Sequence, residues 1–393
     1  MIDRSINNID IKRINKNKIF NLIYKRKKIS KKEIADSLKL SLPTVNQNLK
    51  TLANIGLIRT LGAFESTGGR KAKVISCVEE AKYSIGLDIT KKYISLVLIN
   101  LRGDILHNSH FKRSYSHSNE YYQYLGDLVS DFIVDNKIEK EKILGIGISI
   151  PGILDKLRKK ILYSSHALGI SQVNCSDFSK YIPYNCIFSN DANAAAFAEM
   201  CVNNNIKNVV YLSLNYTVGG AIILNNGIFL GSNQRSGEFG HMTIVPNGKM
   251  CYCSKAGCLN AYCSAAYLSN LADGSLSSFF KNLESGKGDY QLIWDEYLSH
   301  LAIAINNLRM IFDGIVIAGG TVVSYLDKYA VKLKKILLRL NTFESNPNYL
   351  QICKYKFESS AVGAALELVR YCQMLWMRNY TSSRRSLCSH LLY

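Results

Sequence analysis

The stretch GEFGHMTIVPNGKMCYCSKAGCLNAYCS, residues 237–264, contains the most informative pattern in this chain. One histidine and three cysteines within it follow the spacing H-x9-C-x-C-x4-C: His241, Cys251, Cys253 and Cys258. One imidazole and three thiolates can complete a closed tetrahedral shell around Zn²⁺, which is typical of a structural site rather than a catalytic one. Buried free thiols are the alternative, because cysteine often packs as a small apolar residue. The ligand spacing favours zinc.

GEFGH, the cysteine array and the closing CLNAYCS resemble the signature of the ROK family of repressors, open reading frames and sugar kinases. The resemblance implies an α/β fold with two actin/hexokinase-like lobes. It also implies one of two functions. Members are either sugar kinases or sugar-responsive transcription regulators with an added N-terminal DNA-binding domain, and the rest of the chain must decide between them.

Composition sets the broad class of the protein. A chain of 393 residues with 47% hydrophobic content and five prolines is long enough for two or three domains and is not typical of disorder. No apolar run approaches the roughly 18 residues of a membrane helix, and the N-terminus does not resemble a signal peptide. Eleven cysteines, the tightest cluster of them in metal spacing, favour a reducing cytoplasm over a disulfide framework.

The net charge of +19 is concentrated at the N-terminus. Residues 1–80 hold 17 Lys and Arg against 7 Asp and Glu, whereas the remaining residues hold 32 against 23. A basic N-terminal segment favours a polyanionic partner, although basic runs are often solvated surface.

The first eighty residues have the pattern of a winged helix-turn-helix. We predict helices over 17–28 and 31–38, the second opened by a capping box at Ser30, and a third helix capped by Ser41. Strands over 57–61 and 73–77 would form a wing. The side chains placed to contact DNA are Ser41, Thr44, Asn46, Gln47 and Lys50 on the third helix and Arg70 and Lys71 in the wing. The GLIR and GGRK segments resemble those of ROK regulators; a helical domain without a DNA role is the alternative.

Two loops that cradle ATP phosphates in ROK kinases are altered here. The first resembles D-x-G-G-T but reads Asp88-Ile89-Thr90-Lys91-Lys92, and the second resembles G-T-G-x-G but reads 215–219, NYTVG, with only Gly219 kept. Side chains at those positions would occupy the space of the phosphates, and residues other than glycine rarely adopt a positive φ. Phosphoryl transfer depends on positioning, so kinase activity is not expected. Residual nucleotide binding through the two lysines stays open.

The sugar site, by contrast, is largely kept. The resemblance implies that Asn190 and Asp191, which follow a strand, bind adjacent hydroxyls, and that Asp191 would be the general base of a kinase. Without the resemblance, Asn-Asp before a helix is more typical of an N-cap. The full set of residues expected to bind sugar is Asn190, Asp191, Glu238, His241, Asn260 and Gly152. Asn260 replaces a glutamate of the family, which favours a modified sugar, one lacking a hydroxyl, or weaker binding.

These observations lead to one organisation and one function. We expect a DNA-binding domain over 1–80 and a ROK domain over 81–393. Its small lobe would span about 81–190 plus 358–375 and its large lobe about 191–357, with the tail 376–393 unexplained. The expected function is a sugar-responsive transcription regulator, most simply a repressor, that acts on double-stranded operator DNA as a homodimer or homotetramer. A sugar kinase with Asp191 as base and a ligand-independent scaffold are the alternatives.

Overall fold

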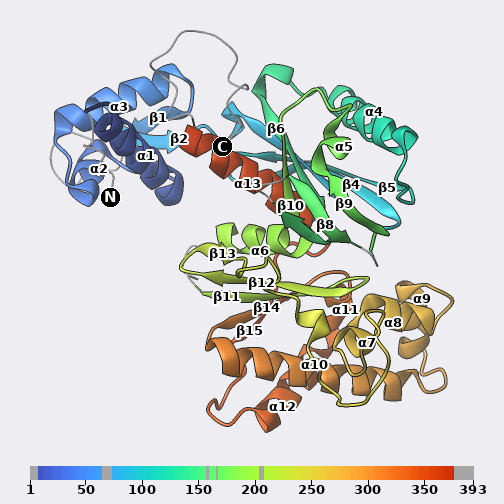
Figure 1. Ribbon diagram of the computed structural model, residues 1–393. Helices are drawn as coiled ribbons and strands as arrows, with labels where there is room; N and C mark the ends of the chain where they lie inside the picture. The colour runs from blue at the N-terminus through green and yellow to red at the C-terminus, as the bar shows by residue number, and fades with distance from the viewer. Residues whose placement is uncertain (1–7, 64–72, 156–158, 165–166, 203–207, 376–393) are drawn as a thin grey trace.

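Figure 1 shows a helical N-terminal unit beside two stacked α/β lobes, which confirms the expected fold class. The computed structural model describes residues 8–63, 73–155, 159–164, 167–202 and 208–375. Among these residues, no helix is both long enough and apolar enough to cross a bilayer.

The N-terminal unit has three helices followed by a two-stranded antiparallel sheet. Its elements are α1 Asn8–Arg26, α2 Lys31–Leu38, α3 Leu42–Asn54, β1 Ile58–Ala63 and β2 Lys73–Cys77. The helix α1 begins before residue 17, where we predicted its start, because the polar segment ahead of that point carries little apolar periodicity. The predicted bounds of α2 and β2 are confirmed.

Local signals and one apolar core explain these helices. Ser30 Oγ accepts a hydrogen bond from the backbone N–H of Glu33, and Glu33 returns one to the backbone N–H of Ser30, so the capping box is confirmed. Ser41 caps α3 through the N–H of Thr44. The three helices share a buried core of Ile19, Phe20, Ile23, Ile34, Val45, Leu49 and Leu52.

The first lobe is built on a five-stranded sheet with the order β10-β6-β3-β4-β5. Its strands are β3 Tyr83–Ile89, β4 Tyr93–Asn100, β5 Ile105–Lys112, β6 Ile143–Ile150 and β10 Cys186–Asn190. A smaller antiparallel sheet holds β7 Ile153–Asp155, β8 Lys160–Ser164 and β9 Ile170–Asn174. The helices and turns are η1 Glu79–Ala81, α4 Asn119–Asp135, η2 Lys140–Lys142, α5 Cys175–Ser179 and α13 Ser359–Leu375. A side chain in place of Gly86 or Gly147 would collide with the backbone of α13, so these glycines allow α13 to lie on the sheet.

The second lobe is built on a sheet with the order β13-β12-β11-β14-β15. Its strands are β11 Val209–Leu214, β12 Val218–Leu224, β13 Gly227–Phe229, β14 Ile315–Gly319 and β15 Leu350–Ile352. Its helices are α6 Asp191–Val202, η3 Phe239–His241, α7 Asn260–Cys263, α8 Ala265–Asn270, α9 Leu276–Glu284, α10 Tyr290–Phe312, α11 Val323–Leu326, η4 Asp327–Tyr329 and α12 Ala330–Leu340. Asn225 and Asn226 have positive φ angles, which are typical of the tight hairpin turn that joins β12 to β13.

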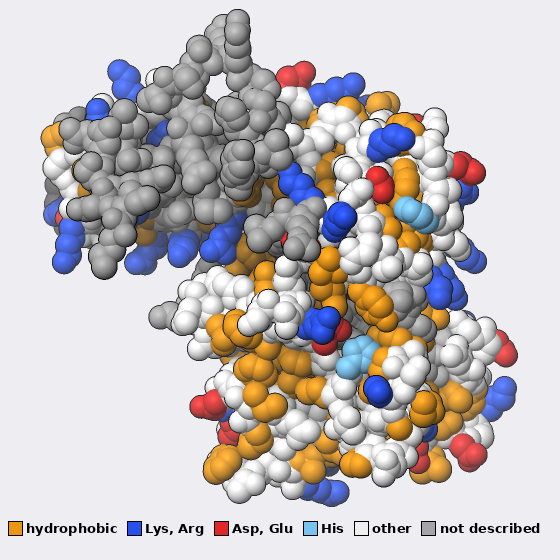
Figure 2. Space-filling view, viewed as in Figure 1, with side chains coloured by type: hydrophobic (Ala, Val, Ile, Leu, Met, Phe, Trp, Pro, Cys, Tyr) orange, Lys and Arg blue, Asp and Glu red, His pale blue; other side chains and the backbone are white. Residues whose placement is uncertain are grey.

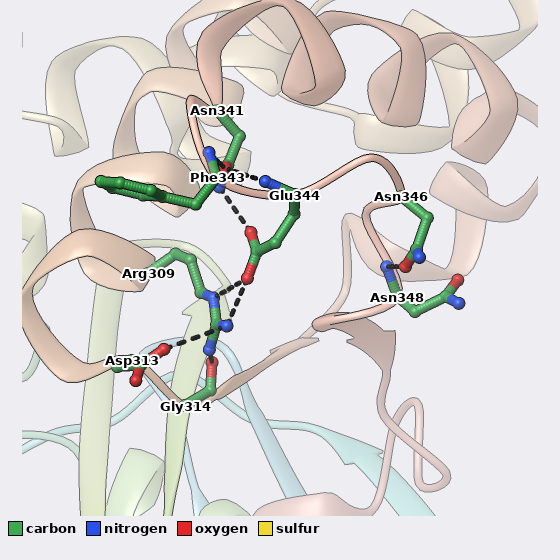
Figure 3. Close-up of polar contacts among 8 residues, drawn as sticks. All are labelled: Arg309, Asp313, Gly314, Asn341, Phe343, Glu344, Asn346 and Asn348. Carbon is green, nitrogen blue, oxygen red and sulfur yellow. Dashed lines mark hydrogen bonds and ion pairs between the residues drawn. The ribbon is translucent and has the colours of Figure 1, made fainter.

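One polar cluster secures the outer end of the second lobe (Figure 3). The Arg309 guanidinium at the end of α10 pairs with Glu344 and also donates to the carbonyl of Gly314 at 3.1 Å. Asn341 Oδ1 accepts from the backbone N–H groups of Phe343 and Glu344. The loop after α12 is therefore tied to the end of α10.

Within the part of the chain that the structure describes, the backbone crosses between the lobes twice, and the two crossings lie together. The first crossing is α6, which follows β10 of the first sheet, and the second is residues 353–358, which lead from β15 to α13. The helices α6 and α13 touch closely, since a Cβ on Gly363 would lie 1.7 Å from the carbonyl oxygen of Ala194. This arrangement places the end of β10, with Asn190 and Asp191, at the junction of the lobes.

Candidate functional site

A cavity of about 610 Å³ opens between the two lobes. In the space-filling view, basic, acidic and histidine side chains gather in the hollow there (Figure 2). The structure brings five of the six predicted sugar residues to its wall: Gly152, Asn190, Asp191, Glu238 and His241. They come from both lobes and are far apart in the chain. The volume and mixed polar lining are typical of a small-molecule site.

Asn190 serves both as a helix cap and as part of the cavity wall. Its Oδ1 accepts from the backbone N–H of Asn193 at 2.9 Å, which caps the first turn of α6. Its Nδ2 donates to the carbonyl of Gly152 and to Asp191 Oδ1, both at 3.0 Å. The cap therefore fixes the asparagine and orients the neighbouring carboxylate, so the two explanations of this motif are compatible.

Burial perturbs the carboxyl groups around the cavity. It raises the pKa of Asp191, and it raises the pKa of Glu238 with a further contribution from the charge of Asp191. Burial, aided by the charge of Asp191, raises the pKa of Asp88 to about 7. When ionised, Asp191 and Glu238 offer only acceptors, which suit the hydroxyl hydrogens of a polyol.

Sequence reasoning missed several lining residues. Gln172 and Gln234 line the cavity from opposite lobes, and both have left-handed backbones with φ of 56° and 58°. Such strained backbone conformations concentrate at functional sites, but no local sequence pattern predicts them at Gln172 and Gln234. Arg235 and Tyr252 also line the cavity; their positions beside the GEFGH motif and between two cysteines were the only signals. The other polar lining side chains are Tyr163, Ser164, Asn193, Ser213, Thr217, Asn233 and Ser236.

Asn260 does not line the cavity, so its expected contact with a sugar is corrected. It is buried at the start of α7, and its Oδ1 accepts from the backbone N–H of Val218 at 2.7 Å. This bond ties α7 to the beginning of β12. An argument about sugar chemistry based on Asn260 therefore has no support in the geometry.

The four predicted metal ligands meet at one point and could hold a metal ion. One ligand atom from each of His241, Cys251, Cys253 and Cys258 lies within 4.8 Å of all the others. The sulfurs of Cys253 and Cys258 are 3.7 Å apart. Zn–S bonds of about 2.3 Å at a tetrahedral angle require a sulfur separation of about 3.8 Å. The donor set and its spacing thus fit a tetrahedral ion.

The two ring nitrogens of His241 have different surroundings. Nδ1 is buried and has no hydrogen-bond partner among the described residues, while Nε2 lies 3.1 Å from the hydroxyl of Tyr252. A buried nitrogen without a partner is costly unless a metal ion or a hydrogen-bond partner satisfies it. With Nδ1 bound to a metal, Nε2 would carry the proton and donate toward Tyr252 or a ligand in the cavity.

The two altered phosphate loops contact each other. The ammonium of Lys91 lies 5.7 Å from the centre of the Tyr216 ring, and Thr90 Oγ1 is bonded to the backbone of Tyr93. The first N–H groups of α8, at Ala265 and Ala266, donate to the carbonyls of Asn215 and Tyr216. In both loops, which cradle phosphates in the kinases, side chains and backbone groups are therefore paired with other protein groups.

The predicted DNA-binding side chains of α3 lie on its outer face. Asn46, Gln47 and Lys50 are exposed, whereas Thr44 is half-buried against the Ser41 hydroxyl at 2.9 Å. Ser41 thus serves as a cap in this structure. Arg70 and Lys71 lie outside the described residues.

Two family models match the chain. Residues 84–370 match the model described as the ROK family, and residues 12–59 match a winged helix-turn-helix DNA-binding model. Together they cover the two parts of the molecule that carry the site and the exposed face of α3.

The similarity to individual proteins agrees with the two family models. The xylose repressor of Bacillus spizizenii is 31% identical over 260 residues, which span 65% of this chain and 66% of that protein, slightly less than two thirds of its length. A ROK family transcriptional regulator, described as a homologue of the Escherichia coli MLC protein, superposes with a TM-score of 0.75 at 18% identity over 93% of this chain and 98% of that chain.

A kinase structure shares the fold of the two lobes. The Streptomyces griseus ROK glucokinase, solved with glucose and AMPPNP, superposes with a TM-score of 0.58 at 22% identity, covering 74% of this chain and 99% of that one. The ROK family model spans most of this chain. The chain therefore belongs to the ROK family.

Proposed function

We propose that this protein is a cytoplasmic, sugar-responsive DNA-binding regulator, most simply a repressor. The observation that carries the proposal is an open cavity lined by Asn190, Asp191, Glu238 and His241 in a chain that also holds a winged helix. A scaffold that had lost its ligand would have no need of such a cavity. The names of the xylose repressor and the MLC homologue support the regulator.

In this proposal the chain divides into a DNA-binding domain over 1–80 and a sugar-binding domain over 81–393. The exposed side chains of α3, Asn46, Gln47 and Lys50, would contact bases and phosphates, with Arg70 and Lys71 reaching the backbone from the wing. Two protomers would contact a two-fold operator as a homodimer or as half of a homotetramer. Sugar would change the DNA affinity by binding one lobe arrangement more tightly than the other.

We assign a structural Zn²⁺ to the cluster of His241, Cys251, Cys253 and Cys258. Its support is the tetrahedral spacing of the sulfurs and the unpartnered Nδ1 of His241. The ion would hold the loop and fix which ring nitrogen of His241 faces the cavity. Thiolate ligands of this kind persist in a reducing compartment, which supports the cytoplasmic assignment.

One observation favours a second function, an ATP-dependent sugar kinase. Asp191, which the family resemblance makes the general base of a kinase, lines the cavity, and the lobes share the fold of a glucokinase solved with glucose and AMPPNP. The contact between Lys91 and Tyr216 and the loss of the loop glycines speak against it, because phosphoryl transfer depends on positioned donors.

One experiment separates these functions. Duplex DNA selected by the protein from a random library is titrated in a fluorescence anisotropy assay with and without a panel of pentoses, hexoses and N-acetylhexosamines. The regulator predicts a change in DNA affinity with at least one sugar. The same panel is then incubated with ATP and Mg²⁺. Sugar-dependent ATP turnover that disappears in Asp191→Asn would establish the kinase instead.

A further inference from the structure

The two crossings between the lobes are joined by one buried carboxylate. Glu199, near the end of α6, is 2% exposed. Its Oε1 accepts from the backbone N–H groups of Lys354 at 2.8 Å and Tyr355 at 3.2 Å. The helix α6 is the first crossing and residues 353–358 are the second, and we call these two segments together the hinge. Glu199 therefore connects the two segments of the hinge. A buried carboxylate is stable only with such partners, so the geometry of the hinge is closely defined.

The hinge in turn contacts a turn of the first lobe. The hydroxyl of Tyr355 donates to the carbonyl of Gly103, at the β4–β5 turn, at 3.2 Å. That turn is itself rigid. Asn100 Oδ1 accepts from the backbone N–H groups of Arg102 and Asp104, and Gly103 has a φ of +83° and lies against Leu366 of α13.

The same turn supports the DNA-binding domain. The Arg102 guanidinium donates to the carbonyl of Tyr24 in α1 at 3.1 Å and lies 5.5 Å from the centre of the Tyr24 ring. It also forms an ion pair with Glu79, in the segment between β2 and β3, and the side chain of Arg102 is only 12% exposed. A planar guanidinium can face the Tyr24 carbonyl, the Tyr24 ring and Glu79 in a fixed geometry, whereas an ammonium is a compact point charge on a flexible stem. The neighbouring residue adds a backbone contact to the same segment, because the Leu101 N–H donates to the carbonyl of Glu79.

These contacts lead from the cavity to the DNA-binding domain. Asp191 lines the cavity at the first turn of α6, and Glu199 lies two turns later on the same helix. A single hydrophobic cluster also joins the N-terminal helices, β4 and α6. We propose that Glu199, Tyr355 and Arg102 form the mechanical link by which sugar occupancy at Asp191 changes the placement of the winged helix. This inference rests on the proposed function and identifies its positioning residues.

The proposed link acts through relative motion of the two lobes. A sugar that binds one separation of the lobes more tightly than another favours that separation, and the resulting rotation is absorbed where the chain crosses between the lobes. Tyr355 belongs to the hinge, whereas Gly103 and Arg102 belong to the support of α1. Motion of Tyr355 is therefore transmitted to Arg102 and Tyr24 as long as these hydrogen bonds hold. A link of this kind is established only when its loss changes the coupling between the two sites and not the sites themselves.

The test measures a coupling factor, defined as the ratio of the DNA dissociation constants with and without saturating sugar. The DNA is the selected duplex, and the sugar is the panel member with the largest effect on the wild-type protein. Tyr355→Phe removes only the hydroxyl that reaches Gly103. Tyr290→Phe is its matched control, because the Tyr290 hydroxyl also donates to a backbone carbonyl, that of Leu271, at 2.8 Å within the second lobe.

The second variant is Arg102→Lys, which keeps the charge but not the planar fork. Its control is Arg113→Lys, because Arg113 likewise combines an ion pair, with Glu120, and a ring contact, with Tyr124, on the far side of the first lobe from α1. Sugar affinity is measured by calorimetry for every variant, and folding by thermal unfolding.

The expected result is a coupling factor about 2- to 10-fold closer to one in Tyr355→Phe, the effect of one hydrogen bond. Arg102→Lys should show an equal or larger loss. Sugar affinity and sugar-free DNA affinity should stay within about twofold of wild type in Tyr355→Phe, and both controls should keep the wild-type coupling. Wild-type coupling in Tyr355→Phe and in Arg102→Lys would overturn the link while leaving the proposed function standing. Absence of any sugar effect in the wild-type protein would instead overturn the proposed function.

Discussion

The hydroxyl of Tyr252 lies 3.1 Å from Nε2 of His241, so the residue between two predicted metal ligands contacts the ring of a third. Both side chains also line the cavity. The metal cluster and the proposed sugar site therefore share a wall. A change on one side of that wall should be measurable on the other.

Replacing Tyr252 by Phe tests this shared wall. Because only the hydroxyl is lost, the four ligands stay in place, and we expect an unchanged content of one metal ion per chain. Sugar affinity should fall by about 2- to 10-fold, because His241 loses the partner that orients its ring. Plasma mass spectrometry gives the metal content and calorimetry the affinity. Tyr267→Phe, whose hydroxyl is bonded to Lys249 outside the cavity, should behave as wild type. Equal sugar affinity in the two variants would contradict the role of Tyr252.

Loss of one sulfur tests the ligand assignment. In Cys253→Ser the closed shell loses a thiolate, so we expect the purified protein to lose its zinc and its response to sugar, while DNA binding without sugar is reduced less. Cys263→Ala removes a neighbouring buried cysteine whose sulfur points to the Tyr297 carbonyl, and it should retain the metal. A full metal content in Cys253→Ser would show that the ligand set is wrong.

The buried carboxyl of Asp88 makes a prediction about pH. Its pKa in the folded protein, about 7, is above the ordinary value of 3.8, so the folded state holds the proton more tightly than the unfolded state. The stabilisation is complete below pH 4 and is lost as pH rises through 7. Between pH 5 and 8, ionisation of Asp88 should lower the free energy of unfolding of the wild-type protein by on the order of 3 kcal/mol. Asp88→Asn should lack this part of the pH dependence.

Urea unfolding at the two pH values measures this difference. Asp131→Asn, at an exposed position of α4, serves as the control and should leave the wild-type pH dependence intact. A wild-type pH dependence in Asp88→Asn as well would mean that Asp88 is not the group responsible.

The Arg309 cluster in Figure 3 should stabilise the fold without a role in function. The side chains of Arg309 and Glu344 are 18% and 24% exposed, so removing the guanidinium leaves a partly buried carboxylate without its partner. We expect Arg309→Met to lower the free energy of unfolding by about 1.5–3 kcal/mol. Lys328→Met breaks a pair with Glu284 that is far more exposed, so its effect on the free energy of unfolding should be clearly smaller. Equal losses in the two variants would contradict this ranking.

Salt dependence tests the DNA-binding surface. Lys50→Ala and Arg70→Ala should weaken operator binding, and each should lower the slope of log K against log salt by about one, because each lysine or arginine that contacts a phosphate releases one counterion. Lys335→Ala, at an exposed position of α12 distant from the winged helix in Figure 1, should leave both quantities unchanged. Unchanged affinity in both DNA-face variants would place the DNA surface elsewhere.

Short-range patterns in the chain determined much of this architecture. The capping box at Ser30 and the cap at Ser41 act over a few residues, so both could be predicted directly from the sequence. The four metal ligands fall within eighteen residues, and their spacing alone predicted that they would meet.

Only the tertiary structure decided which side chains share the cavity and which do not. Gln172 reaches it through a left-handed backbone within β9, and Asn260 is turned away by its bond to Val218, because both depend on contacts with distant parts of the chain. The same holds for Glu199, Tyr355 and Arg102, whose hydrogen bonds in this link join residues 78 to 252 positions apart. Local patterns specify caps, turns and ligand spacing, whereas a cavity wall and a hinge are set by the packing of segments whose separation in sequence carries no signal of their contact.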